Sequence, residues 1–265
     1  MISKYDFRGK VAIVTGSAMG IGKAIAEKLY QYGANVVISD ILLEKGKETV
    51  ALLGERAIFI PCDISDPEQV ISLIKATIKY FGKLDIMVNN AGVNSVKVED
   101  RVTIDKYPDQ TWHKIMDIDL NGTFYCCKAA AKVMIEQRSG TIITIASVAG
   151  VVALRLQIGF VAAKAAILKM TEAMACELGE YGIRVNAVSP GSIVTSTTRE
   201  LFYSEKGSFS KMAERVVSFI PQKRPGKADE IADAVAFLAS DSASYINGHN
   251  IVVDGGWIAG FNRDF

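Results

Sequence analysis

The chain has 265 residues, of which 49% are hydrophobic, so it can bury the core of one large α/β domain or of two small ones. Its 30 basic and 29 acidic residues leave a net charge of +1, which gives no reason to expect nucleic acid or an anionic membrane as a partner. The N-terminus lacks the apolar core of a signal peptide and no apolar run could span a bilayer, so we expect a cytoplasmic protein.

The first elements are organised around a glycine-rich turn. The apolar run Val11–Val14 predicts a buried strand, and a helical pattern follows near 20–32. A second apolar run, Asn35–Ser39, ends on Asp40. The turn between the first strand and the helix contains Gly16, Gly20 and Gly22. This arrangement is typical of dinucleotide binding, because the glycines admit the pyrophosphate and the acid accepts the ribose hydroxyls.

The alternation of strands and helices continues to the C-terminus. Further strands are expected at Ala57–Pro61, Leu84–Val88, Thr141–Ile145, Arg184–Val188 and Asn250–Val253, and helices near 43–53, 67–81, 111–137, 157–178 and 228–239. Strands separated by helices indicate βαβ crossovers. We therefore predict a single α/β domain over residues 1–265, a Rossmann-type doubly wound parallel sheet of about seven strands with helices on both faces.

Two longer polar segments interrupt this rhythm, residues 93–110 and residues 191–226. Both follow predicted strands at their carboxyl ends, where open α/β sheets bind ligands. The segment at 191–226 is therefore a candidate lid or substrate loop.

The four cysteines have no metal-ligand spacing, and no metal site is expected. We expect them to be buried free thiols in a reducing compartment. They are Cys62, Cys126, Cys127 and Cys176.

Several ordered motifs carry a family resemblance. They are T-G-S-A-M-G-I-G at 15–22, C-D-I at 62–64, N-N-A-G at 89–92, Ser147 in I-A-S-V-A-G, Lys164 in F-V-A-A-K-A-A, R-V-N-A-V-S-P-G at 184–191 and V-D-G-G at 253–256. Through them the chain closely resembles the short-chain dehydrogenase/reductase family over almost its full length. The resemblance implies a nicotinamide cofactor and a homotetramer whose subunits pair their long helices across a dyad.

The resemblance, together with the opening motif, assigns a set of expected cofactor contacts. They are Gly16, Ser17, Met19, Gly20, Ile21, Gly22, Asp40, Ile41, Cys62, Asp63, Ile64, Asn89, Asn90, Ala91, Gly92, Lys164, Pro190, Gly191, Ile193 and Thr195. Asp40 places a carboxylate where the 2′-phosphate of NADP would lie, and its neighbours Ser17 and Ile41 are not basic. The sequence therefore predicts NAD as the cofactor.

The chemical centre follows from the same resemblance. The family uses a serine, a tyrosine thirteen residues later and a lysine four residues beyond that, and Ser147, position 160 and Lys164 match this spacing. A lysine beside a tyrosine would lower the pKa of the phenol, which then exchanges a proton with the substrate oxygen. Position 160 is Phe160, which cannot transfer that proton. We expect cofactor binding to survive and catalysis to be impaired.

Three explanations of Phe160 remain open. It is an engineered Tyr→Phe change, a natural feature of a non-catalytic NAD-binding sensor or scaffold, or part of an enzyme with another proton donor, for instance Asp119 through water.

Asp119 is itself a departure, because the family usually has asparagine there. An aspartate can accept the same hydrogen bonds and adds a charge that favours the lysine cation, so we expect it to be tolerated.

The expected substrate contacts are Asn94, Ser147, Ala149, Leu154, Gln157, Gly191, Arg199 and Phe202. Their polar members favour a sugar, polyol or hydroxy acid whose secondary alcohol is oxidised by NAD. The alternative is a 3-oxoacyl-carrier-protein reductase, which the motifs resemble equally well.

The predicted helices also carry more apolar positions than one sheet face requires, which supports the tetramer: Phe124, Ala129, Val133, Ile167, Met170 and Met174.

Overall fold

The computed structural model describes residues 5–94, 98–195 and 210–260. Its centre is a seven-stranded sheet in the order β3-β2-β1-β4-β5-β6-β9, in which every neighbouring pair is parallel. The strands are β1 (Val11–Thr15), β2 (Asn35–Asp40), β3 (Ala57–Pro61), β4 (Ile86–Asn89), β5 (Gly140–Ile145), β6 (Ile183–Pro190) and β9 (Asn250–Val253). The predicted parallel sheet of a single domain is confirmed.

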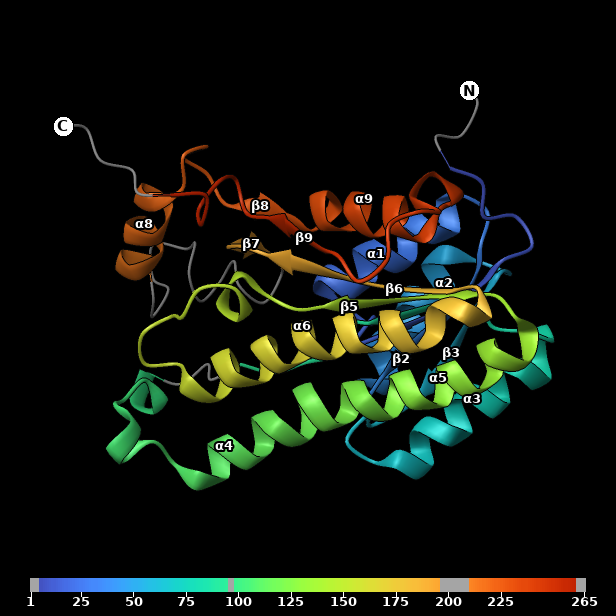
Figure 1. The fold of residues 1–265 in the computed structure, drawn as a ribbon, viewed down its shortest axis with the longest axis horizontal. Coiled ribbons are helices and arrows are strands. Elements are labelled where there is room, and N and C mark those ends of the chain that lie inside the picture. Colours follow the sequence, from blue (N-terminus) through green and yellow to red (C-terminus); the bar gives the residue numbers. More distant parts are fainter. Residues whose placement is uncertain (1–4, 95–97, 196–209, 261–265) are drawn as a thin grey trace.

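Helices cover both faces of this sheet, as Figure 1 shows. One face carries α1 (Gly20–Gln31), α2 (Leu43–Leu53) and α9 (Ala228–Ala239), and the other carries α3 (Pro67–Phe81), α5 (Thr123–Gln137) and α6 (Ile158–Leu178). Side chains alternate between the two cores: Ala12 and Val14 of β1 join the first, and Ile13 joins the second. All three are completely or almost completely buried, as expected for a parallel sheet.

The expected helix at 111–137 contains a π-helical stretch. It begins as α4 (Asp109–Ile115), widens over Met116–Gly122 and continues as α5. π-helical insertions occur mostly at functional sites. Asp119 lies in the middle of this stretch and is fully buried.

The segment at 191–226 has more structure than a polar connection. It contains the short strand β7 (Ile193–Val194), which pairs with β8 (Gly226–Lys227), and the helix α8 (Ser210–Phe219). Short 3₁₀ turns complete the fold at Val98–Asp100, Ile104–Lys106, Val148–Gly150, Gly179–Tyr181 and Asp241–Ala243. Residues 196–209, the middle of the predicted lid, lie outside the described part of the chain.

The cysteines are all free in the structure, but one expectation is wrong. Cys62, Cys126 and Cys127 are buried, whereas Cys176 is exposed on α6. Among the described residues, no helix has the length and apolarity to cross a membrane, and no cluster of three or more His, Cys, Asp or Glu side chains could hold a metal ion.

The strand order reverses direction between β1 and β4, because the chain runs outward from β1 to β3 and then returns to the other side of β1. In open α/β sheets, the crevice at the carboxyl ends of such a strand pair is the place where ligands bind. The glycine turn follows β1 and the N-N-A-G segment follows β4, so both meet at this crevice.

Candidate functional site

The glycine turn approaches the end of β4 so closely that side chains are excluded. A Cβ on Gly22 would lie 2.2 Å from Gly16 O and 2.4 Å from Asn90 Nδ2, and a Cβ on Gly16 would lie 2.7 Å from Ala91 Cα. Gly16 and Gly20 also have positive φ angles of 61° and 60°. The turn runs directly into α1, whose N-terminus has no side-chain cap, so its first N–H groups remain available to an anion.

Thr15 joins the two strand ends, and sequence reasoning missed it. Its Oγ1 accepts hydrogen bonds from the backbone N–H groups of Asn90 (3.0 Å) and Ala91 (3.1 Å). In return, Asn90 Nδ2 donates to Thr15 O and Gly16 O, both at 2.9 Å. Asn90 therefore satisfies two backbone carbonyl groups at the turn. The only signal for Thr15 was its place directly before the first glycine.

Asn89 does something different from its neighbour. Its side chain is buried, and Nδ2 donates to Cys127 Sγ on α5 at 3.1 Å. Asn89 and Asn90 thus form different contacts, because successive residues of a strand point to opposite faces.

Asp40 and α2 hold the glycine turn from the other side. Asp40 Oδ2 accepts the N–H of Ala18 and Oδ1 accepts the N–H of Leu42, both at 3.0 Å, while Thr49 Oγ1 donates to Ala18 O at 3.1 Å. Each carboxylate oxygen keeps a further lone pair for a ligand. Ile41, next to the acid, is 69% exposed and free to cover a flat ring.

Ser17 departs from its expected role. Its side chain is completely buried, and its Oγ donates to Val14 O at 2.6 Å and accepts the N–H of Ser39 at 3.0 Å. The hydroxyl therefore joins the turn to β2 and is turned away from any ligand. Lys45 Nζ, which sequence reasoning did not consider, lies 4.0 Å from Met19 Sδ in the same turn.

The remaining predicted cofactor residues surround the crevice. A Cβ on Gly20 would lie 3.6 Å from Thr195 Cγ2, so the chain after β7 reaches the glycine turn. Cys62 and Ile64 are buried after β3, and Asp63 between them is exposed. Burial raises the pKa of Cys62 to about 11, so its thiol stays protonated and is no nucleophile. Ile21, Pro190, Gly191 and Ile193 lie in α1, at the end of β6 and in β7.

These features fit a dinucleotide. Gly16 and Gly22 let the turn pack against the end of β4 without side chains, the free N–H groups of α1 suit a pyrophosphate, and Asp40 stands at the end of the next strand.

Asp119 and Lys164 form a buried ion pair beside the N-N-A-G segment. Lys164 Nζ lies 3.1 Å from Asp119 Oδ2 and 3.2 Å from Ile145 O, to which it donates. Asp119 Oδ1 accepts the N–H of Val93 at 2.7 Å. A Cβ on Gly92 would lie 3.1 Å from the carboxylate and 3.3 Å from the ammonium, so this backbone passes directly over the pair. The π-helical stretch and α6 thus bring the two charges to the cofactor crevice.

Phe160 faces the same lysine. Its ring centroid lies 5.6 Å from Lys164 Nζ, one helical turn away on α6. Ser147 follows β5 in a turn, and its Oγ accepts the N–H of Ala149 at 3.1 Å. That turn packs on α6, since a Cβ on Gly150 would lie 2.6 Å from Lys164 O. The structure therefore gathers two of the other three predicted catalytic positions, Asp119 and Phe160, around Lys164 and places the Ser147 turn against its helix.

Polar side chains from the 93–110 segment lie against the first turn of α6. Asn94 Nδ2 donates to Gln157 Oε1 at 3.0 Å. The hydroxyl of Tyr107 lies 2.9 Å from the position that a Cβ on Gly159 would take. Burial raises the pKa of Tyr107, so the phenol stays protonated. Sequence reasoning missed Tyr107, because no local spacing links it to α6.

Two other predicted substrate residues lie in or after the Ser147 turn. Ala149 is buried, and Leu154 is half-buried after the Ser147 turn. Arg199 and Phe202 lie outside the described residues.

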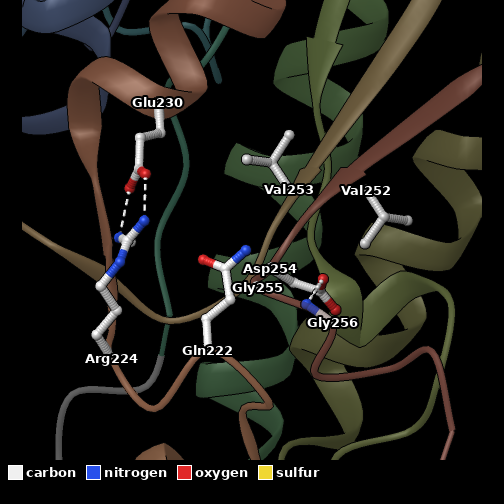
Figure 2. Close-up of a pocket in the computed structure, with 9 residues that line it drawn as sticks. Gln222, Arg224, Glu230, Val252, Val253, Asp254, Gly255 and Gly256 are labelled. Carbon is white, nitrogen blue, oxygen red and sulfur yellow. Dashed lines mark hydrogen bonds and ion pairs between the residues drawn. The ribbon is translucent and has the colours of Figure 1, made fainter.

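A separate pocket of about 300 Å³ opens at the end of β9. Figure 2 shows Arg224 and Glu230 paired at one side of it, with Arg224 Nη2 at 2.7 Å from Glu230 Oε1. These hydrogen bonds lower the pKa of Glu230 to about 2. Asp254 is also satisfied internally, because its oxygens accept the N–H groups of Gly256 and Ile258, both at 2.8 Å. The charged groups here serve the fold. None of the lining residues is a predicted contact residue, but Gln222, Arg224 and Gly226 belong to the predicted lid or substrate segment at 191–226.

The comparisons with known proteins agree with this geometry. A family model described as enoyl-(acyl carrier protein) reductase matches residues 16–258. An uncharacterized oxidoreductase of Thermotoga maritima is 38% identical, covering 95% of this chain and 98% of that protein. A 3-oxoacyl-(acyl-carrier-protein) reductase of Escherichia coli is 37% identical over the same shares of the two chains. The crystal structure of a levodione reductase has a TM-score of 0.88 at 34% identity and covers 96% of this chain and 100% of its own.

The glycine cradle yields a direct prediction. Gly22→Ala places a methyl group on backbone atoms that cannot withdraw, so we expect a loss of about 1–3 kcal/mol in the free energy of unfolding and weaker binding of nicotinamide dinucleotides. Urea denaturation and calorimetric titration measure the two effects. Gly260→Ala is the control, because no atom lies within 4 Å of its Cβ position. Equal stability of the two variants would contradict the close approach.

Proposed function

Because the chain belongs to the short-chain dehydrogenase/reductase family, we propose that its site binds NAD and serves the interconversion of a secondary alcohol and a ketone. The observation that carries this proposal is the meeting of a glycine cradle with a buried lysine. Gly92 belongs to the N-N-A-G segment that borders the cradle, and its backbone lies against the Asp119–Lys164 pair. A cofactor on the cradle would therefore extend toward Lys164.

NAD is the proposed cofactor because Asp40 places a negative charge at the ribose end. When bound, the nicotinamide accepts or supplies the hydride. The residues that would hold it are the glycine turn, Asp40 and Lys164. One contact favours NADP instead: Lys45 Nζ, near Met19, offers a cation at the glycine turn.

A binding comparison separates the two cofactors. The unchanged protein should bind NAD more tightly than NADP, and Asp40→Asn should reduce this preference by about tenfold, because the repulsion of the 2′-phosphate is removed. Calorimetric titration with each dinucleotide measures the preference. Glu44→Gln is the matched control, since this exposed acid pairs with Lys47. Tighter binding of NADP by the unchanged chain would refute the assignment.

The proposed substrate is a small hydroxylated molecule, a sugar, polyol or hydroxy acid. Support comes from Asn94 and Gln157, whose linked side chains lie where α6 begins. Ser147 would orient the reacting oxygen from its turn after β5. A second candidate is the reduction of a 3-oxoacyl thioester on a carrier protein, favoured by the name of the Escherichia coli relative.

The proposed site lacks an acid–base group at position 160. A phenyl ring at position 160 can neither donate nor accept a proton, so the chain as written is a catalytically impaired form. Ser147 still offers a hydrogen bond to the substrate oxygen, and Lys164 still offers a cation. A non-catalytic role in sensing or scaffolding is the alternative that retains cofactor binding without turnover.

Restoring the phenol tests the catalytic proposal. Phe160→Tyr should raise the rate of NAD reduction by about 10²–10⁴, the usual contribution of a general acid or base. The assay follows NADH absorbance over a panel of sugars, polyols and hydroxy acids, with 3-oxoacyl thioesters assayed in the reverse direction. Phe81→Tyr, the same change at the end of α3, should leave the rate unchanged. If Phe160→Tyr gains no activity on any substrate, the non-catalytic alternative stands.

We also infer that the chain forms a homotetramer through α5 and α6. Phe124 is 46% exposed, and Ala129 and Val133 line an apolar groove of about 850 Å³ between α3 and α5. Ile167 does not contribute, because it is buried in the subunit core and the expectation that it faces a partner is wrong.

Sedimentation equilibrium tests this assembly. The expected mass is four times that of the 28.7 kDa chain. Phe124→Lys should shift the distribution toward smaller species, because it places a charge on the proposed contact face. A monomer at all concentrations would rule the tetramer out.

A further inference from the structure

The ion pair between Asp119 and Lys164 is unlike the others that the described residues form. Its side chains are 0% and 7% exposed. Every other pair between described residues leaves at least one side chain 37% exposed or more. A buried pair adds little net stability, but removing one partner leaves an uncompensated charge and is strongly destabilising. Each member therefore depends on the other.

In the described part of the chain, the Lys164 ammonium has few polar partners. Besides Asp119, its ammonium meets Ile145 O at 3.2 Å and the Phe160 ring at 5.6 Å. A ring at that distance attracts a cation weakly and offers neither a charge nor an oxygen acceptor. Among the described side chains, Asp119 is the one carboxylate within 4.0 Å of the ammonium.

Position 160 determines how much the lysine needs that carboxylate. Phe160 stands one turn before Lys164, so a tyrosine there could offer a phenol oxygen on the same helix face. Phenylalanine offers none. The Asp119 carboxylate therefore provides the oxygen partner for the Lys164 ammonium that a phenylalanine at position 160 cannot provide.

We infer that Asp119 and Phe160 form one matched unit around Lys164. Asp119 is a positioning residue that holds the Lys164 side chain in place in a site whose position 160 has no phenol oxygen. The inference rests on the proposed cofactor site and deepens it, because the fixed ammonium lies under Gly92 and serves to bind hydroxyl oxygens of a dinucleotide. The two positions are then linked through Lys164, so a change at either one alters how much the lysine depends on the other.

A double-mutant cycle read by thermal unfolding tests the unit without any substrate. Asp119→Asn should lower Tm by about 10 °C, because Lys164 loses its counter-charge. In the Phe160→Tyr background the same change should cost roughly half of that or less, because the phenol oxygen then accepts from the ammonium. Equal losses in the two backgrounds would overturn the inference.

The matched control is Asp117→Asn. Asp117 is an exposed carboxylate in the same π-helical stretch and accepts a hydrogen bond from Asn121. Its removal should lower Tm only slightly and equally in both backgrounds. Should Asp119→Asn fail to fold, Asp119→Asn/Lys164→Met removes both charges and should fold. Failure of this double variant to fold, or no gain in stability over a folded Asp119→Asn, would contradict the charge argument.

NAD titration supplies the second readout. Folded Asp119→Asn should bind NAD about tenfold more weakly, and Asp119→Asn/Phe160→Tyr should regain most of that affinity. A purely structural role for Asp119 predicts no such rescue, and unchanged affinity in Asp119→Asn would refute the inference. Absence of NAD binding in every form, the unchanged chain included, would instead refute the proposed function.

Discussion

The site depends on the absence of side chains where the glycine turn crosses the end of β4. The Gly22 backbone lies so close to Gly16 and to the Asn90 amide that a Cβ on Gly22 would overlap both. Because the backbones are this close, Thr15 Oγ1 reaches two N–H groups after β4 and joins the strands at the switch point of the sheet. The same approach points the free end of α1 into the crevice, so one steric constraint produces both the junction and the anion site.

Binding and proton transfer are separate properties of this crevice. In the proposed function, the glycine turn and Asp40 would hold the cofactor through backbone groups and one carboxylate, none of which would take part in the chemistry. Proton transfer needs a titratable group at position 160, and Phe160 has none. Lys164 is proposed to serve both cofactor binding and proton transfer, and its ion pair with Asp119 favours the role in cofactor binding. The proposed function therefore keeps cofactor binding and leaves the acid–base step without a group at position 160.

The features that the sequence predicted are those written in local patterns. The parallel sheet follows from apolar runs separated by amphipathic stretches, and the cofactor frame follows from glycines at a strand–helix turn. The missed features depend on contacts between distant segments. The π-helical stretch around Asp119, the burial of Ser17 and the approach of Tyr107 to Gly159 all result from tertiary packing. Such contacts cannot be predicted from the spacing of residues along the sequence.

The most direct test of this account is a crystal structure of the unchanged chain with NAD. The account predicts the pyrophosphate on the turn of Gly16 and Gly22, with Lys164 Nζ bonded both to Asp119 and to a ribose hydroxyl of the cofactor. No oxygen acceptor from position 160 would be present. A cofactor bound elsewhere, or Lys164 turned away from Asp119 while NAD occupies the crevice, would contradict the central claim.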